Sequence, residues 1–385
     1  MKKFGIVTLF LAMACVIPAS VFGAIIHVPD DEPTIQAGID AANYLDTVLV
    51  ADSTWTGPGN KNLDFKGKAI TVKSENGPEN CIIDCEYEGR GFYFHTNEGV
   101  NSVVSGFTIT HGSASRGGGI YCGSSSPTIT DCIITYNVAS DDGGGINCDY
   151  YSPTITNCII SYNFCSDCGG GVSFVETNSP TITDCIISYN TANNGGGINC
   201  YKSQSTTIKN CTIDNNTSHL GGGIHCNSYY QTITNCTIRD NISDTSNGGG
   251  INFNSYPTIT NCILWDNTPD EIGRAGGTIT VTYSDVQGGY AGDGNIDDNP
   301  LFVGANDYHL TSGSPCIDKG TSEGAPDHDI DGDSRPLGNG YDIGSDEFSN
   351  GVPPNDCECD LNSDGKCDMQ DWLIFGEDWG RTDCP

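Results

Sequence analysis

A repeat of about 26 residues runs through most of the chain and constrains the fold more than any other feature. The segment SPTITDCIITYN (126–137) returns as SPTITNCIISYN (152–163) and SPTITDCIISYN (179–190), and looser copies lie at 206–216, 231–241 and 257–267. The first column of cysteines in these copies is Cys132, Cys158, Cys185, Cys211, Cys236 and Cys262. A second column follows GGGI runs and contains Cys122, Cys148, Phe174, Cys200, Cys226 and Phe253. Two columns with one period indicate a solenoid.

The pattern inside each repeat is that of short strands. Apolar and polar residues alternate, as in Ile146-Asn147-Cys148, and Gly, Asn, Ser and Pro interrupt the alternation after a few residues. Segments this short and rich in Thr and Ile favour strands over helices. Leucine-rich repeats have a similar period but need regular leucines, which are absent. We therefore expect an all-β, right-handed parallel β-helix, in which equivalent residues of successive turns stack about 4.8 Å apart.

Polar positions repeat with the same period. An asparagine follows each first-column cysteine by five residues, and these are Asn137, Asn163, Asn190, Asn216, Asn241 and Asn267. Stacked amides can hydrogen-bond along such a column. The GGG runs predict a turn that needs positive φ or close backbone approach.

Both ends of such a solenoid need a cover. Residues 33–43 place Ile35, Ile39 and Ala42 on one helical face, with Pro33 in the first turn, and predict a helical lid. Residues 278–348 are expected to close the other end.

Residues 1–23 have the features of a secretory signal peptide. Lys2 and Lys3 precede an apolar stretch at 6–17, which is short for a membrane span. Its removal takes the net charge from −33 to −35, because no acidic residue is lost. We expect a secreted or cell-surface protein, a monomer with no membrane span after signal removal, whose charge repels nucleic acid and anionic lipid.

With Cys81, which continues the first column toward the N-terminus, eleven of the 20 cysteines lie in the columns, where we expect free, buried thiols. Cys165 and Cys168 form a CxxC pair in a turn, for which a loop disulfide is expected. Cys357, Cys359, Cys367 and Cys384 lie near an acidic C-terminal loop, where disulfides would stabilise a very small unit.

The segments HVPDDEPTIQAGIDAAN, DTVLVADSTWTG and KAITVKSENGPENCIIDC resemble the start of secreted bacterial pectin-lyase-like β-helix proteins. The GGGI and SPTIT repeats match that superfamily over roughly 25–300. DYHLTSGSPCIDKG and DHDIDGDSRPLGNGYDIGSDEF resemble the module that commonly follows them, and DLNSDGKCDMQD resembles half of a type I dockerin. After the signal peptide at 1–23, the resemblance implies a β-helix at 24–306, a closing module at 307–350 and a dockerin-like tail at 351–385.

The tail contains the sharpest candidate site. Its ligand set follows an EF-type calcium loop and comprises Asp360, Asn362, Asp364, Lys366 through its carbonyl, Asp368 and Asp371. The dockerin resemblance implies Asp at the last position and a cohesin-like or cell-surface partner. A dockerin pair needs a second loop, and the nearest candidate, Asp327, Asp329 and Asp331, has Gly338 at its twelfth position. A turn is therefore favoured there over a weak calcium site.

The function classes left open are a binding or adhesive module for extracellular polysaccharide and a polysaccharide lyase or hydrolase. Tyr136, Tyr162 and Tyr189 form either an exposed stripe for sugar rings or a stacked column. Catalytic residues are not identifiable. Asp141 and Asp142 are adjacent, and the cations at 116, 202, 209 and 239 show no acidic partner at repeat spacing. The histidines at 95, 111, 219 and 225 look isolated. The sequence therefore favours binding over catalysis.

Overall fold

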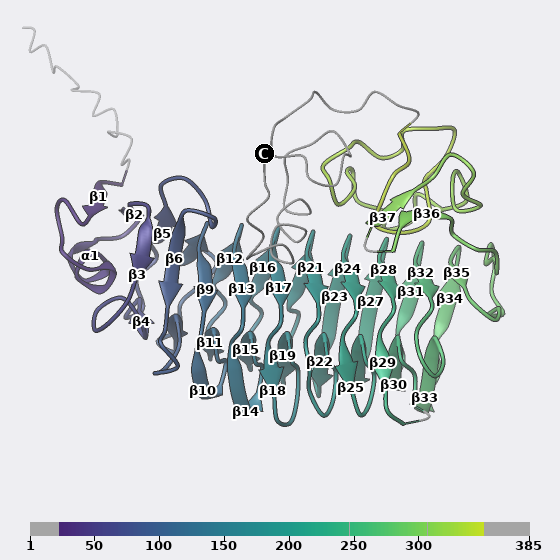
Figure 1. Ribbon diagram of the computed structural model, residues 1–385, viewed down its shortest axis with the longest axis horizontal. Coiled ribbons are helices and arrows are strands. Elements are labelled where there is room, and N and C mark those ends of the chain that lie inside the picture. Colours follow the sequence, from purple (N-terminus) through teal and green to yellow (C-terminus); the bar gives the residue numbers. More distant parts are fainter. Residues whose placement is uncertain (1–22, 246, 306, 350–385) are drawn as a thin grey trace, which may run out of the picture.

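The computed structural model describes residues 23–245, 247–305 and 307–349, which form a parallel β-solenoid with little helix (Figure 1). Three long sheets run along it. Sheet A contains β1 (Ile25–Val28), β2 (Thr47–Val50), β5 (Thr71–Ser74), β8 (Val103–Ser105), β12 (Thr128–Thr130), β16 (Thr154–Thr156), β20 (Thr181–Thr183), β23 (Ser205–Lys209), β27 (Tyr230–Thr234), β31 (Thr258–Thr260) and β34 (Thr280–Thr282). Sheet B contains β3 (Ser53–Trp55), β6 (Cys81–Asp84), β9 (Thr108–Thr110), β13 (Ile133–Thr135), β17 (Ile159–Ser161), β21 (Ile186–Ser188), β24 (Thr212–Asp214), β28 (Thr237–Arg239), β32 (Ile263–Trp265) and β35 (Asp285–Val286).

Sheet C faces a different side of the coil, and short strands pair beside it. Sheet C contains β4 (Leu63–Asp64), β7 (Phe92–Phe94), β11 (Ile120–Gly123), β15 (Ile146–Asp149), β19 (Val172–Val175), β22 (Ile198–Tyr201), β26 (Ile224–Asn227), β30 (Ile251–Ser255) and β33 (Ile272–Gly277). The short strands are β10 (Ser113–Arg116), β14 (Val138–Asp142) and β18 (Phe164–Cys165), and β25 (Thr217–Ser218) with β29 (Ile242–Ser243). A hairpin of β36 (Phe302–Gly304) and β37 (Asp307–Leu310) follows the solenoid.

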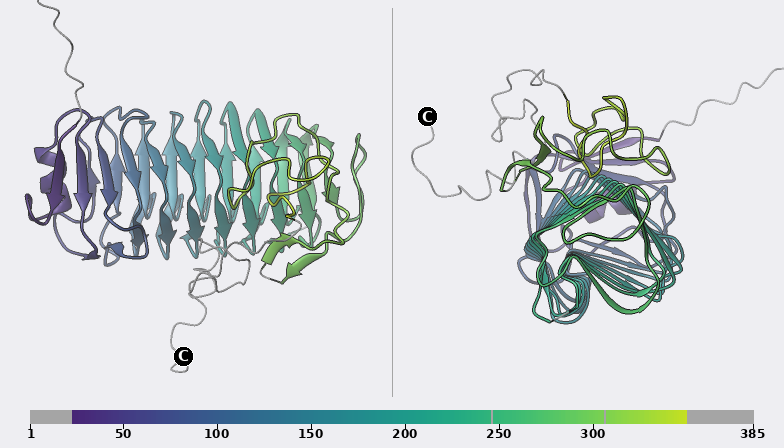
Figure 2. Two further views of the ribbon diagram at one scale, coloured as in Figure 1. Left: turned by 90° about the horizontal axis from the view of Figure 1, so that it is seen from above. Right: turned by 90° about the vertical axis from the view of Figure 1, so that its right-hand side faces the viewer.

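The strand register confirms that one sequence repeat forms one coil of the solenoid. Cys122 pairs with Cys148, and Ile129 pairs with Ile155, one repeat later in each case. The thiol of Cys158 contacts those of Cys132 and Cys185, and all three side chains are fully buried. Viewed along the axis, the coils superimpose (Figure 2). The prediction of an all-β parallel solenoid with inward apolar columns is confirmed.

The asparagine column forms a continuous hydrogen-bonded ladder. Asn163 Nδ2 donates to Asn190 Oδ1 at 3.0 Å, and Asn190 Nδ2 donates to Asn216 Oδ1 at 3.0 Å. The ladder ends at Glu271, whose carboxylate accepts from the backbone N–H of Asn267 at 3.1 Å and from its side-chain amide. Burial raises the pKa of Glu271 to about 7.

The glycine runs are required for two separate reasons. Gly143, the first of its run, has φ of 62°, which favours glycine. A Cβ on Gly145, the third, would lie 2.7 Å from the carbonyl oxygen of Gly171 in the next coil. The run therefore lets consecutive coils approach closely.

The N-terminal end is covered as predicted by a short helix, α1 (Ile35–Ala41). Ile35, Ile39 and Ala42 are buried against the first strands. Thr34 is the N-cap and accepts from the backbone N–H of Ala37 at 3.2 Å. Pro33 therefore precedes the helix, and its predicted place in the first turn is wrong.

Only the first part of residues 278–348 closes the other end. The backbone of Ile296 bonds to Ser284 and Val286 of the last coil. Residues 302–305 and 307–349 instead fold back along the outside of sheet B (Figures 1 and 2). Ser345 Oγ, for example, lies 3.1 Å from Thr212 Oγ1. The expectation that this whole segment covers the end is wrong, because its apolar side chains pack on the flank.

The cysteines of the described residues are free thiols, as expected for the columns. Cys165 and Cys168 are also free, so the predicted loop disulfide is wrong. Cys165 is buried in a small cluster with Ala139 and Ala192, and its thiol contacts the carbonyl oxygen of Asp141 at 3.2 Å. Cys165 occupies the same position of its coil as Ala139 does in the coil before, and its side chain therefore points inward. The cysteines at 357, 359, 367 and 384 lie outside the described residues.

Candidate functional site

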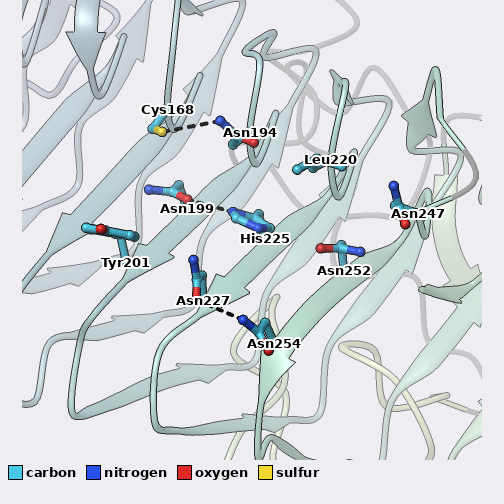
Figure 3. Close-up of a pocket in the computed structure, with 10 residues that line it drawn as sticks. All are labelled: Cys168, Asn194, Asn199, Tyr201, Leu220, His225, Asn227, Asn247, Asn252 and Asn254. Carbon is cyan, nitrogen blue, oxygen red and sulfur yellow. Dashed lines mark hydrogen bonds between the residues drawn. The ribbon is translucent and has the colours of Figure 1, made fainter. Parts of the chain in front are cut away.

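A groove runs along the outer face of sheet C, parallel to the solenoid axis. In these strands the column residues, such as Cys200 and Cys226, face the core, so their neighbours point outward. A cavity of about 400 Å³ lies over β22, β26 and β30 (Figure 3). It is lined by Cys168, Asn194, Leu220 and Asn247 along one side, by Asn199, His225 and Asn252 in the middle, and by Tyr201, Asn227 and Asn254 along the other.

The repeat period places these residues. Asn194, Leu220 and Asn247 each directly precede a GGG run, and Asn199, His225 and Asn252 each follow the first glycine by four residues. The three rows are therefore the same three positions of successive coils. Sequence reasoning missed this site, although aligning the repeats would have shown a run of asparagines at outward positions.

The middle row of the groove is hydrogen-bonded along the axis. Asn199 Nδ2 donates to Ser173 Oγ at 3.1 Å, which leaves its Oδ1 to accept from His225 Nδ1 at 3.0 Å. Burial lowers the pKa of His225 to about 4, so the ring is neutral near pH 7. With Nδ1 protonated, Nε2 is a hydrogen-bond acceptor. Among the described residues, Asn252 Nδ2 has no partner although it is buried. The middle row therefore contains an acceptor, His225 Nε2, and a buried amide donor without a partner, Asn252 Nδ2.

The lining of the groove carries no formal charge at neutral pH. None of its ten residues is Asp, Glu, Lys or Arg. Six are asparagines, whose amides both donate and accept hydrogen bonds. Such a lining suits an uncharged ligand with many hydroxyl or amide groups.

A charged cluster lies on the same face of the solenoid, nearer the N-terminus. Arg116 Nη1 lies 3.2 Å from Asp149 Oδ2, and its Nε lies 3.5 Å from Asp142 Oδ2. Tyr121 donates its hydroxyl to Asp149 at 2.9 Å. Burial raises the pKa of Asp142, and the charge of Arg116 opposes this. The expectation that Arg116 lacks an acidic partner is wrong, because Arg116 and Asp142 both directly precede GGG runs and so pair in register.

Other polar residues thought to be isolated also pair across coils. Lys202 Nζ lies 3.3 Å from Glu176 Oε1. His111 and His219 bond to carboxylates one coil away, at 3.0 Å from Asp84 and 2.6 Å from Asp244. His95 Nε2 lies 3.4 Å from Asp64 Oδ2. These histidines and Lys202 therefore belong to polar columns. The expectation from the sequence that they lack partners is wrong.

The repeated tyrosines form a stacked column. The Tyr136 and Tyr162 ring centroids are 5.2 Å apart with an interplanar angle of 11°, and those of Tyr162 and Tyr189 are 4.9 Å apart at 4°. Their faces therefore cover one another. A sugar ring packs on an aromatic face, so this column does not offer the open stripe considered above.

The acidic loop at 327–333 is a turn and not an assembled calcium loop. Asp329 Oδ1 accepts from the backbone N–H groups of Asp331 and Asp333, at 3.0 and 2.8 Å. Asp327 pairs with His328, and Asp331 Oδ2 lies 3.0 Å from His309 Nε2. Asp327 and Asp331 thus bond to different histidines, and Asp329 bonds to the backbone of its own turn.

His309 lies at the centre of the one group in the described residues with metal-ligand spacing, which also includes Asp331 and Asp346. Burial disfavours its charge, but hydrogen bonds to Asp307 and Asp331 raise the pKa of His309 to about 12. Burial raises the pKa of Asp346 to about 7. The charged imidazole thus ties β37 to the 327–333 turn.

Several predicted features lie outside the described residues. They are residues 1–22 of the predicted signal peptide (1–23) and the calcium ligands Asp360, Asn362, Asp364, Lys366, Asp368 and Asp371. Among the helices that the structure describes, none has the length and apolar character needed to span a bilayer.

Comparisons with known proteins agree with this architecture. A model of the right-handed β-helix region matches residues 47–191 and 163–290. No curated protein matches the sequence. One solved structure, that of the PL6 family alginate lyase AlyGC, is 11% identical, with a TM-score of 0.23 over 74% of this chain and 54% of that chain. This chain thus spans about half the length of the lyase, and so low a TM-score supports no statement about activity. The family match covers most of the repeats, and the chain belongs to the right-handed β-helix family.

Proposed function

We propose that this protein is a secreted or cell-surface module whose sheet C groove binds an uncharged extracellular polysaccharide. The observation that carries the proposal is the alignment of three rows of neutral polar side chains along the solenoid axis. Neighbouring coils repeat about every 4.8 Å, so a linear polymer lying in the groove meets the same kinds of groups again and again.

Charge supports an uncharged ligand over an acidic one. The chain has a net charge of −33, which disfavours the approach of polyanions. The groove has no cation among its lining residues to offset this repulsion. Amide side chains and the neutral imidazole of His225 can instead exchange hydrogen bonds with hydroxyl groups.

A glycan array followed by calorimetry tests the proposal. Asn227 and Asn254 lie at the groove edge, with Asn254 Nδ2 donating to Asn227 Oδ1 at 3.4 Å. Replacing both with Ala removes roughly 1 kcal/mol for each ligand bond lost, so affinity should fall about tenfold or more. Asn76→Ala, at an exposed position elsewhere, is the matched control and should bind like the wild type. Equal glycan affinity of all three proteins would refute the groove as the binding site.

A second candidate is catalysis on a polysaccharide, as a lyase or hydrolase. It is supported by the convergence of Arg116, Asp142, Asp149 and Tyr121 on the same face as the groove. A carboxyl group with a raised pKa beside a cation can serve in acid–base chemistry. Assays for reducing ends and unsaturated products, with Asp142→Asn as the test variant, decide it. Glycan binding without product formation would support the binding function and contradict catalysis.

We also propose that the tail at 351–385 binds calcium and attaches the protein to a cohesin-like or cell-surface partner. The support is the ligand spacing from Asp360 to Asp371. Calorimetry on the full chain should show calcium uptake that is lost in Asp364→Ala, and equal uptake would contradict the site. A cohesin pull-down in calcium and in chelator tests the partner.

N-terminal sequencing of the exported protein tests secretion, and the mature chain should start near Ala24.

A further inference from the structure

Two straight rows of threonine run along the outer face of sheet A, over the seven strands from β12 to β34. In each strand a core residue such as Ile155 lies between two residues that point outward. The strands pair in register, without shifts. The first row is Thr128, Thr154, Thr181, Thr207, Thr232, Thr258 and Thr280, and the second is Thr130, Thr156, Thr183, Lys209, Thr234, Thr260 and Thr282.

The two rows form a lattice of nearly constant spacing. Neighbouring strands lie about 4.8 Å apart and the two outward residues of one strand about 6.7 Å apart, so each row is about 29 Å long. The coils superimpose in the axial view (Figure 2), which keeps the rows parallel to the axis. Strand propensity does not explain the uniformity, because valine, isoleucine and tyrosine also favour strands. The face therefore repeats one pair of groups, a hydroxyl and a methyl, in two directions.

The first row presents its hydroxyl groups to solvent. Every residue of this row is exposed or half-buried. Within the described part of the chain, Thr128 is the one member whose hydroxyl has a protein partner, the carbonyl oxygen of Val100 at 2.9 Å. The second row is held more firmly, since Thr183 Oγ1 donates to Thr156 Oγ1 at 3.0 Å, and Thr234 is buried. Hydroxyl groups at regular intervals are thus free to bind a ligand along the first row.

The charge and shape of the face restrict the ligand. Lys209 is the single charged residue in the two rows, although the chain has a net charge of −33. An ionic partner would therefore find no complementary charges, and the face suits an uncharged one. The rows contain no aromatic ring on which a sugar could pack. A ligand that uses both rows at once must itself repeat in two dimensions, as a crystal surface does and a single polymer chain does not.

We propose that this threonine face binds ice. An ice surface is an uncharged lattice of water oxygens with a repeat close to the strand spacing. Threonine hydroxyls both donate and accept hydrogen bonds, so a row of them can take the places of lattice waters. The methyl groups between them restrict the orientation of the adjoining water. Each contact is weak, but the two rows supply thirteen threonines at once, and simultaneous contacts multiply. The inference does not depend on glycan binding, because the sheet C groove lies on another side of the coil.

Partition of the full-length protein into slowly growing ice tests the proposal, together with thermal hysteresis. Thr181→Tyr places a ring in the middle of the first row, prevents flat contact and should reduce both quantities about fivefold or more. The matched control, Thr217→Tyr, makes the same change at an exposed position of β25, outside sheet A, and should behave like the wild type. Thr258→Tyr, at an exposed position of the first row, repeats the test if Thr181→Tyr alters the circular dichroism spectrum. Exclusion of the wild type from ice, or equal incorporation of the first-row and control variants, would overturn the proposal.

Other periodic partners are measured with the same variants. Sedimentation with microcrystalline cellulose and chitin tests a crystalline polymer, and light scattering tests a second copy of the chain. Wild-type protein that binds either polymer or self-associates, loses this in Thr181→Tyr and does not enter ice would overturn ice binding and assign the face to that partner. Incorporation into ice that only the first-row variants lose would support it.

Discussion

Asn190 lies in the middle of the asparagine ladder, and its replacement by Ala should destabilise the solenoid strongly. Its Nδ2 donates to Ile160 O at 2.7 Å and to Asn216 Oδ1 at 3.0 Å. Its Oδ1 accepts from the backbone N–H and the side-chain amide of Asn163, at 2.9 and 3.0 Å. All four bonds are buried. At about 1 kcal/mol each, the loss is about 4 kcal/mol, a large share of the stability of a typical domain.

Urea denaturation under reducing conditions measures this loss. The control is Asn193→Ala, three residues along, where the side chain is exposed and the expected change is within about 0.5 kcal/mol. A loss below about 1 kcal/mol in Asn190→Ala, or equal losses in both variants, would show that the ladder does not hold the coils together.

Three further predictions follow from buried groups. Because the pKa of Glu271 is raised to about 7, the protonated carboxyl group stabilises the folded state. This contribution is complete below about pH 4.5 and is lost as the pH rises through 7. Between pH 4.5 and 8 the wild type should therefore lose roughly 3 kcal/mol relative to Glu271→Gln in urea titrations, and parallel curves would contradict it. The 15 described cysteines should all react with a thiol reagent after denaturation, but in the folded protein only Cys168, the half-buried one among them, should do so; fewer than 15 in denaturant would reveal disulfides. Because burial lowers the pKa of His225 to about 4, glycan affinity should be flat between pH 5 and 8 in calorimetry, and a decline with a midpoint near 6.5 would show that the ring is not buried.

The repeated part of the fold was predictable because stacking converts sequence spacing into spatial neighbours. The cysteine columns, the asparagine ladder and the glycine turns all follow from one period. The same rule could have paired Arg116 with Asp142, since each directly precedes a GGG run. The groove was predictable in the same way, since its residues occupy equivalent outward positions of successive repeats.

Other features could not be derived from spacing. The period places Tyr136, Tyr162 and Tyr189 in one column, but the orientation of their rings depends on backbone φ near 54° and on the side-chain rotamers. The position of residues 302–349 was also hidden, since this segment has no repeat. Its place on the flank is set by contacts such as Ile343 with Ile263, which lie far apart in sequence. Tertiary packing, and not local pattern, decides such features.

The claim that the coils present a repeating binding groove is tested most directly by calorimetry with neutral oligosaccharides of increasing length. The account predicts that affinity rises with chain length until the groove is filled, then levels off, and that the Asn227→Ala, Asn254→Ala protein loses this rise. Affinity that is independent of length, or a rise that survives both substitutions, would contradict it.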